Sequence, residues 1–123
     1  MNLLLDTHVV IWWVAGERLR AEAADAIADP DNLVHVSAAS IWEISIKQAL
    51  GKLSVDGDLD GVVADDFEPL DITAVHARLA GELPDHHADP FDRMLIAQAS
   101  IDDLAIVTRD PAFAAYDVAV MAA

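Results

Sequence analysis

The sequence predicts an α/β fold, with a mostly parallel five-stranded sheet covered by helices on both faces in three layers. Five short apolar runs alternate with stretches of helical spacing. Strands that are apolar along their whole length are typical of parallel sheets with both faces buried. Alternation of strands and helices along the chain indicates the same architecture. The five runs are Leu3–Leu5, Leu33–Val36, Phe67–Leu70, Ala105–Val107 and Val118–Val120.

Five stretches predict helices, and several of them end at clear signals. The stretches are residues 9–13, 19–28, 40–50, 73–83 and 91–101. Pro30 and Pro84 each follow a predicted helix, because the residue before a proline disfavours helical backbone. Gly51 follows the third stretch, where a left-handed residue commonly ends a helix. Thr73 is a good N-cap for the fourth.

Length and composition favour one domain spanning residues 1–123. This is a common size for a single domain with its own core, and a 54% hydrophobic content excludes a disordered chain. No apolar run is long enough to span a bilayer, and Asp6 interrupts the first, so we expect neither signal peptide nor anchor. The lack of cysteine excludes disulfides and thiolate zinc sites. We therefore expect a cytoplasmic protein.

The chain is strongly acidic, with 22 acidic and 7 basic residues and a formal net charge of −15. A protein that binds nucleic acid mainly by counterion release would be basic. Two interpretations remain open from composition alone. The acids form a solubilising surface, or some of them converge and are held together by divalent cations.

The placement of four acids favours convergence. Ligands of open parallel sheets bind beyond the carboxyl ends of the strands. Asp6 directly follows the first predicted strand and Asp110 follows the fourth, although each also suits a helix N-cap. Glu43 lies among apolar residues, and two local roles are open to it: a capping box with Ser40, or an i,i+4 pair with Lys47.

The fourth acid lies in the segment DPFD, residues 89–92. Asp89 as N-cap, Pro90 at the first helical position and Asp92 at the third form a complete helix start. We expect the positive end of this helix to help keep Asp92 ionised. His86 and His87 precede it without a metal-ligand spacing such as HExxH, so we expect them on a surface loop.

Together these four carboxylates predict a metal site. Several neighbouring carboxylates cannot all stay ionised without cations, and oxygen ligands select Mg²⁺ or Mn²⁺. Such ions can activate water and stabilise the leaving oxygen of a phosphodiester. The candidate ligands and catalytic residues are Asp6, Glu43, Asp92 and Asp110.

Four segments resemble the PIN-domain ribonucleases of the VapC toxin type, from bacterial toxin–antitoxin pairs. They lie in the family's order and spacing and cover nearly the whole chain: LLLDTHVVIWW, VSAASIWEISIKQALGKL, HHADPFDRMLIAQA and IVTRDPAF. The resemblance implies a PIN-like sandwich, Mg²⁺- or Mn²⁺-dependent RNA cleavage, a cognate antitoxin and dimerisation. The family's acidic positions match Asp6, Glu43, Asp92 and Asp110, the last being the most variable, whereas Asp89 matches none.

Basic and aromatic residues beside the predicted ligands have expected roles of their own. Arg93 and Arg109 each neighbour a candidate ligand, so we expect them either to bind RNA phosphates or to neutralise the acidic cluster. Thr7 can hydrogen-bond the site or cap the first helix, and we expect the cap. Trp12 and Trp13 are adjacent and cannot both face one core, so we expect one of them to pack against a dimer mate or the antitoxin.

Two alternatives remain open. A catalytically silent PIN-like module would act only through its partner. A haloacid-dehalogenase-like phosphatase, like a receiver domain, would also place an acid after its first strand. The phosphatase would have a second aspartate at position 8, where this chain has His8. The phosphatase and the receiver domain would each have a lysine late in the chain, but no lysine follows Lys52.

Asp89 and Asp92 are expected to differ in function although they share one helix start. Asp92→Asn should abolish RNA cleavage while the fold survives, because the metal loses a ligand. Asp89→Asn should keep much of the activity, since asparagine is also a good N-cap. Cleavage rates and circular dichroism of both variants test this division, and equal losses of activity would contradict it.

Overall fold

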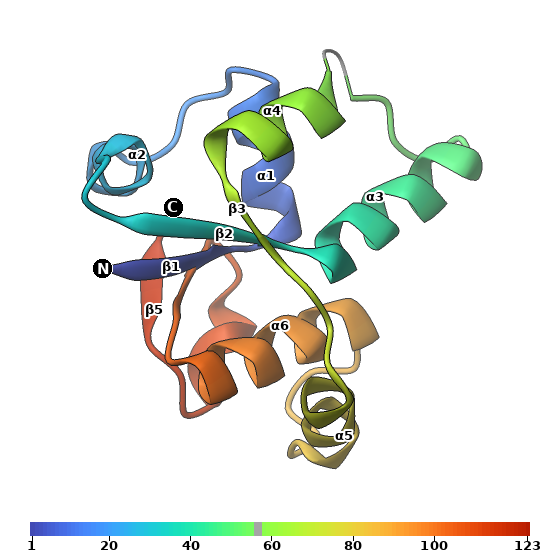
Figure 1. The fold of residues 1–123 in the computed structure, drawn as a ribbon. Coiled ribbons are helices and arrows are strands. Elements are labelled where there is room, and N and C mark those ends of the chain that lie inside the picture. Colours follow the sequence, from blue (N-terminus) through green and yellow to red (C-terminus); the bar gives the residue numbers. More distant parts are fainter. Residues whose placement is uncertain (56–57) are drawn as a thin grey trace.

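The computed structural model describes residues 1–55 and 58–123, and its five strands form one sheet with the order β3-β2-β1-β4-β5 (Figure 1). All four neighbouring pairs are parallel, which confirms the predicted fold class. The strands are β1 (Asn2–Leu5), β2 (Leu33–Ser37), β3 (Glu68–Leu70), β4 (Ala105–Thr108) and β5 (Val120–Ala122).

Helices cover both faces of the sheet. On one side lie α1 (Thr7–Val14), α2 (Ala21–Ala28) and α4 (Leu59–Asp66), and on the other lie α5 (Ala74–Glu82) and α6 (Pro90–Asp102) (Figure 1). Helix α3 (Ala38–Ala49) leaves the carboxyl end of β2 and extends beyond the sheet. Leu3 and Leu5 belong to one hydrophobic cluster and Leu4 to the other. Alternate side chains of β1 therefore fill opposite cores, which explains its continuous apolar run.

Two boundaries differ from the prediction, and one of them decides the role of Glu43. Strand β5 begins at Val120, opposite Ile106, and not at Val118, which packs against the α6 side of the core. Helix α3 begins at Ala38, because Ser37 and not Ser40 is its N-cap. The capping-box role of Glu43 with Ser40 is therefore wrong, because Ser40 lies inside the helix.

Helix α4 was not predicted. It contains no fully buried residue, and Asp58, Asp60, Asp65 and Asp66 obscure its apolar side in the sequence. Leu59, Val62 and Val63 nevertheless pack against the core of the α1 side. Contacts with the rest of the fold therefore stabilise this segment as a helix, because its own apolar pattern is weak.

Most expected caps are confirmed, whereas the cap expected from Thr7 and the separation expected of Trp12 and Trp13 are wrong. Asp6, Thr73, Asp89 and Asp110 each accept a backbone hydrogen bond at a helix start. Thr7 does not cap a helix, because its hydroxyl donates to Ser40 Oγ at 2.9 Å. Trp12 and Trp13 both pack against one core of the chain, so the expectation that they cannot share a core is wrong. Both stay partly exposed, and the packing of one of them against a partner stays a prediction.

The fold gathers several segment ends at the carboxyl edge of the sheet. Strands β1 and β4 are parallel neighbours, so the residues that follow them leave the sheet side by side. The amide of Asp6 donates to Val107 O at 3.0 Å and holds the two ends together. Among the helices in the described part of the chain, none is long and apolar enough to cross a membrane.

Candidate active site

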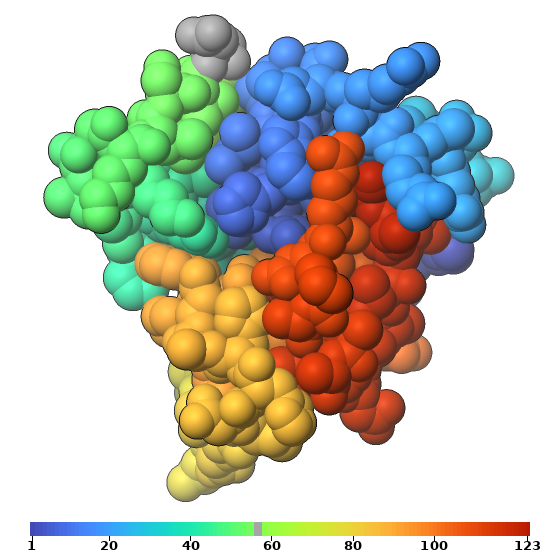
Figure 2. All heavy atoms as spheres, turned by 180° about the vertical axis from the view of Figure 1, so that it is seen from behind, coloured from blue at the N-terminus to red at the C-terminus, as the bar shows by residue number. Residues whose placement is uncertain are grey.

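Four chain segments meet where β1 and β4 end. Asp6 follows β1 directly and Asp110 lies two residues after β4, while Glu43 projects from α3 and Asp92 from the first turn of α6. Figure 2 shows segments from the blue, green, orange and red parts of the chain meeting on one face of the molecule. Asp6 and Glu43 are close enough to Asp92 for their charges to shift its pKa.

Asp6 is buried and well supplied with hydrogen-bond donors. Thr108 Oγ1 donates to Asp6 Oδ2 at 2.6 Å, and the amide of His8 donates to Oδ1 at 3.3 Å. Burial by itself raises the pKa of Asp6, but the bonds from His8 and Thr108 outweigh it and lower that pKa below its ordinary value. Asp6 is therefore a permanently ionised carboxylate at neutral pH.

Glu43 is also buried, and only one of its oxygens is paired. Lys47 Nζ donates to Oε2 at 2.5 Å across one helical turn, which confirms the predicted pair; its Glu43 end is buried, whereas the Lys47 side chain is 39% exposed. This bond raises the pKa of Lys47. Oε1 is buried and, among the residues that the structure describes, has no hydrogen-bond partner. A buried acceptor without a partner is costly, so this oxygen is suited to a cation.

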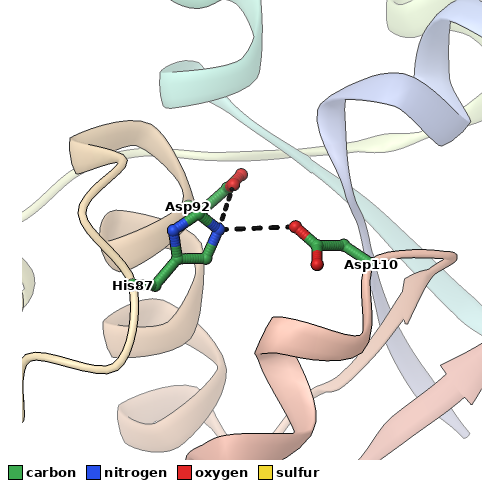
Figure 3. A group of neighbouring side chains, drawn as sticks. All are labelled: His87, Asp92 and Asp110. Carbon is green, nitrogen blue, oxygen red and sulfur yellow. Dashed lines mark ion pairs between the residues drawn. The ribbon is translucent and has the colours of Figure 1, made fainter.

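Asp92 and Asp110 lie on either side of His87 (Figure 3). His87 Nε2 is 2.8 Å from Asp92 Oδ2 and 3.4 Å from Asp110 Oδ2. Burial, with the charges of Asp89 and Asp6, raises the pKa of Asp92 to about 7, although the charge of His87 opposes this. The expectation that the helix terminus would keep Asp92 ionised is therefore wrong for the metal-free protein, because burial and acidic neighbours outweigh the helix dipole.

Asp110 and Asp89 both act as caps. Asp110 Oδ1 accepts from the amide of Ala112 at 2.9 Å, ahead of the short helix η1 (Pro111–Ala115). Asp89 Oδ1 accepts from the amides of Phe91 and Asp92 at 2.8 and 3.3 Å. Asp110 still directs Oδ2 into the cluster, so one carboxylate serves both the helix and the site.

The two arginines beside the ligands are occupied within the chain. Arg93 donates to the carbonyls of Ala80, Leu83, Pro84 and His87, so it ties α6 to the end of α5. Arg109 donates to the carbonyls of Ala123 and Arg18, and its guanidinium lies 4.1 Å from the centre of the Trp12 ring. The structure thus shows a scaffolding role for both arginines, while phosphate binding or neutralisation of the cluster by either one stays a prediction.

Sequence reasoning missed two residues of the cluster. His87 was expected on a surface loop, yet its side chain is 17% exposed and lies between two predicted ligands. The pair of histidines close to DPFD was the signal, but only the fold shows which of them points inward. Thr108 joins two ligand segments, because its hydroxyl donates to Asp6 and accepts from the amide of Asp110 at 3.0 Å.

The residues present fit a hard divalent cation. The donors are carboxylate oxygens of four acids, which is the ligand type of Mg²⁺ and Mn²⁺. The unpartnered Glu43 Oε1 and the raised pKa of Asp92 both indicate excess negative charge that a cation would relieve. His87, Asp92 and Asp110 each offer an atom within 4.8 Å of the others, which is close enough for a shared ion.

Comparisons with known proteins show the family and the fold of the chain. A family described as "PIN domain" matches residues 3–119. Ribonuclease VapC22 of Mycobacterium tuberculosis is 34% identical over 118 residues, which cover 89% of this chain and 87% of that protein. The structure of VapBC2 from Rickettsia felis bound to promoter DNA has a TM-score of 0.76 at 14% identity, over 99% and 98% of the two chains. VapBC-5, a toxin–antitoxin system of M. tuberculosis, gives 0.65 at 25% identity, over 98% and 96%.

The pKa of Asp92 makes the stability of the metal-free protein depend on pH. The folded state holds this proton up to pH about 7, whereas an ordinary aspartate releases it near 3.8. Its stabilising contribution is therefore complete below pH about 4 and is lost as the pH rises towards 7. Asp92→Asn cannot ionise, so its advantage in unfolding free energy over the wild type should grow across this range to about 4 kcal/mol at most.

Denaturant unfolding of both proteins in EDTA measures this difference between pH 4 and 8. With Mg²⁺ in place of EDTA, the difference in unfolding free energy should be smaller, because Mg²⁺ stabilises the wild type. Asp85→Asn, on an exposed loop position, is the matched control and should give a difference that stays flat with pH. A flat difference for Asp92→Asn as well would disprove the raised pKa.

Proposed function

Because the chain belongs to the PIN-domain family, we propose that it is a Mg²⁺-dependent endoribonuclease that serves as the toxin of a toxin–antitoxin pair. Mn²⁺ is a suitable substitute. The observation that carries the proposal is the convergence of Asp6, Glu43, Asp92 and Asp110 at the carboxyl ends of β1 and β4. The similarity to Ribonuclease VapC22 supports RNA as the substrate. In this proposal residues 1–123 form a single PIN domain.

The proposed chemistry is hydrolysis of an RNA phosphodiester by water. Mg²⁺ would supply the activation of that water and the stabilisation of charge on the phosphoryl oxygens. Asp6 offers an ionised oxygen held in direction by Thr108. Glu43 offers the unpartnered Oε1, while Lys47 holds its other oxygen. Asp92 releases its proton to become a ligand, and Asp110 contributes the oxygen that its cap leaves free.

A cavity beside Asp110 is the proposed path of the RNA strand. It has a volume of about 530 Å³ and is lined by Arg20, Thr108, Arg109 and Asp110, among others. Arg20 is exposed at the start of α2. The chain has only seven basic residues, and several are bound internally. Among the residues that the structure describes, Arg20 has no ion-pair or hydrogen-bond partner for its guanidinium, so it is well placed to bind a flanking phosphate beside Asp110.

We further propose that an antitoxin and a second copy of this chain are its protein partners. The solved structures that it resembles include VapBC assemblies of a toxin with its antitoxin. Trp42 supports a partner surface near the site, because it is 60% exposed and lies edge-on to Phe91, 5.2 Å away between ring centres. Large exposed aromatic side chains are enriched at protein interfaces.

Removal of metal or of Asp6 should abolish cleavage of RNA. The metal contributes several kcal/mol to the transition state, so EDTA or Asp6→Asn should slow cleavage by about 100-fold or more. Asparagine keeps the helix cap, and Asp117→Asn, on an exposed loop position, is the control with the same change of charge. Gel assays with structured and unstructured RNA report the rate. Cleavage that survives EDTA would exclude the metal mechanism, and inert wild-type protein would favour a silent binding module.

Arg20 should contribute to RNA affinity. Arg20→Ala in the Asp6→Asn background removes one phosphate contact, so the slope of log K against log salt should become shallower by about 0.7. Arg78→Ala is the matched control, because Arg78 is exposed on α5 beside Glu82 and its loss changes the net charge equally. Fluorescence anisotropy with a labelled single-stranded RNA measures both. Identical slopes for the two variants would contradict the proposed path.

A further inference from the structure

His87 is the one residue of the cluster whose chemistry the proposed metal site does not define. The protein holds it firmly. Its amide donates to Tyr116 Oη at 2.9 Å, and that hydroxyl in turn donates to Pro84 O at 2.7 Å. The imidazole lies edge-on to Phe113, with 6.0 Å between ring centres. The ring therefore has a fixed position between α6 and η1.

The hydrogen bond to Nδ1 defines the tautomer of this ring. The amide of Asp89 lies 3.3 Å from His87 Nδ1 and can only donate. Nδ1 must therefore present its lone pair, and in a neutral imidazole the single ring hydrogen is then on Nε2. The same Asp89 caps α6 with its side chain, so one residue fixes both the helix start and the ring.

Nε2 faces the gap between two carboxylates (Figure 3). It is 2.8 Å from Asp92 Oδ2 and 3.4 Å from Asp110 Oδ2. Nε2 is buried and, within the described part of the chain, has no hydrogen-bond partner, although an oxygen of each carboxylate lies within ion-pair distance.

A nitrogen in this position could serve either as a metal ligand or as a hydrogen-bond donor. Distances alone allow a metal ligand, since the three groups lie within 4.8 Å. Ligation needs the Nε2 lone pair, so the hydrogen would have to move to Nδ1, where it would oppose the amide hydrogen of Asp89. A donor needs no such change. The contact with Asp89 therefore favours the donor.

We propose that His87 is a positioning residue that presents Nε2–H to both Asp92 and Asp110, and that the metal is held by carboxylate oxygens without a nitrogen ligand. The proposal rests on the metal site of the proposed function. The shared hydrogen lies between two groups that would otherwise repel each other. It orients both carboxylates towards one cation, as partners of metal ligands commonly do, and keeps the donor set suited to Mg²⁺.

Two spectroscopic measurements test the tautomer and the ligand set. In metal-free protein with ¹⁵N-labelled histidine, nuclear magnetic resonance should show His87 with its hydrogen on Nε2. With Mn²⁺ added, pulsed electron paramagnetic resonance should show no coupling from a directly bound histidine nitrogen. Hydrogen on Nδ1, or a directly bound nitrogen that His87→Gln removes, would overturn the proposal.

Variants test the positioning role through metal affinity, which does not require turnover. In calorimetry, His87→Leu should weaken Mg²⁺ and Mn²⁺ binding by similar factors, each about 10-fold or more. His87→Gln retains an N–H donor and should recover most of the loss. His86→Gln, at the exposed neighbouring position, should match the wild type, and thermal unfolding checks that all variants fold.

The outcomes separate this inference from the proposed function. A wild type that binds neither ion would overturn the metal site and His87's role in it. Normal wild-type binding, with His87→Gln as weak as His87→Leu and a reduced preference for Mn²⁺, would overturn only the donor role. That result would make His87 a nitrogen ligand, because imidazole favours transition metals over Mg²⁺.

Discussion

Four carboxylates share one end of the sheet, and their mutual repulsion is the constraint on which the rest of the site depends. Ionised groups that are close together and shielded from water destabilise one another strongly. Three of the four acids have different compensations in the metal-free chain. Asp6 has hydrogen-bond donors, Glu43 has Lys47, and Asp92 has a raised pKa. A divalent cation would replace these separate solutions with a single one.

Helix starts give the site its rigidity. Asp6, Asp89 and Asp110 each accept a backbone hydrogen bond at the beginning of a helix. A cap uses one oxygen and fixes the direction of the carboxylate. The other oxygen of Asp6 or Asp110 can therefore face the site with little further loss of side-chain conformational entropy. Asp89 has no such second oxygen in the cluster. Its amide orients His87 instead, and its side chain starts the helix that carries Asp92.

The acidic surface also limits how this protein can bind RNA. Binding through many phosphate contacts is excluded by the net charge of −15. Arg93 and Arg109 donate hydrogen bonds to backbone carbonyls. Arg93 thereby joins α6 to α5, and Arg109 joins the C-terminal segment to α1. In the proposed function, affinity would therefore come from few contacts near the metal. This favours a substrate recognised by its shape close to the scissile bond over one bound along its length.

The sequence by itself determined the parallel sheet, most helix starts and the four acids, because these depend on apolar runs and on residues that are local neighbours. Strand burial and caps act over a few residues, so Asp89-Pro90 or Thr73 can be interpreted without the fold. Tertiary structure alone decided the ionisation of Asp92, the inward direction of His87 and the use of Arg93. Each depends on groups distant in sequence, such as Asp6 near Asp92 or the carbonyl of Ala80 beside Arg93. Electrostatic and hydrogen-bond partners of this kind are set by packing, which no local pattern records.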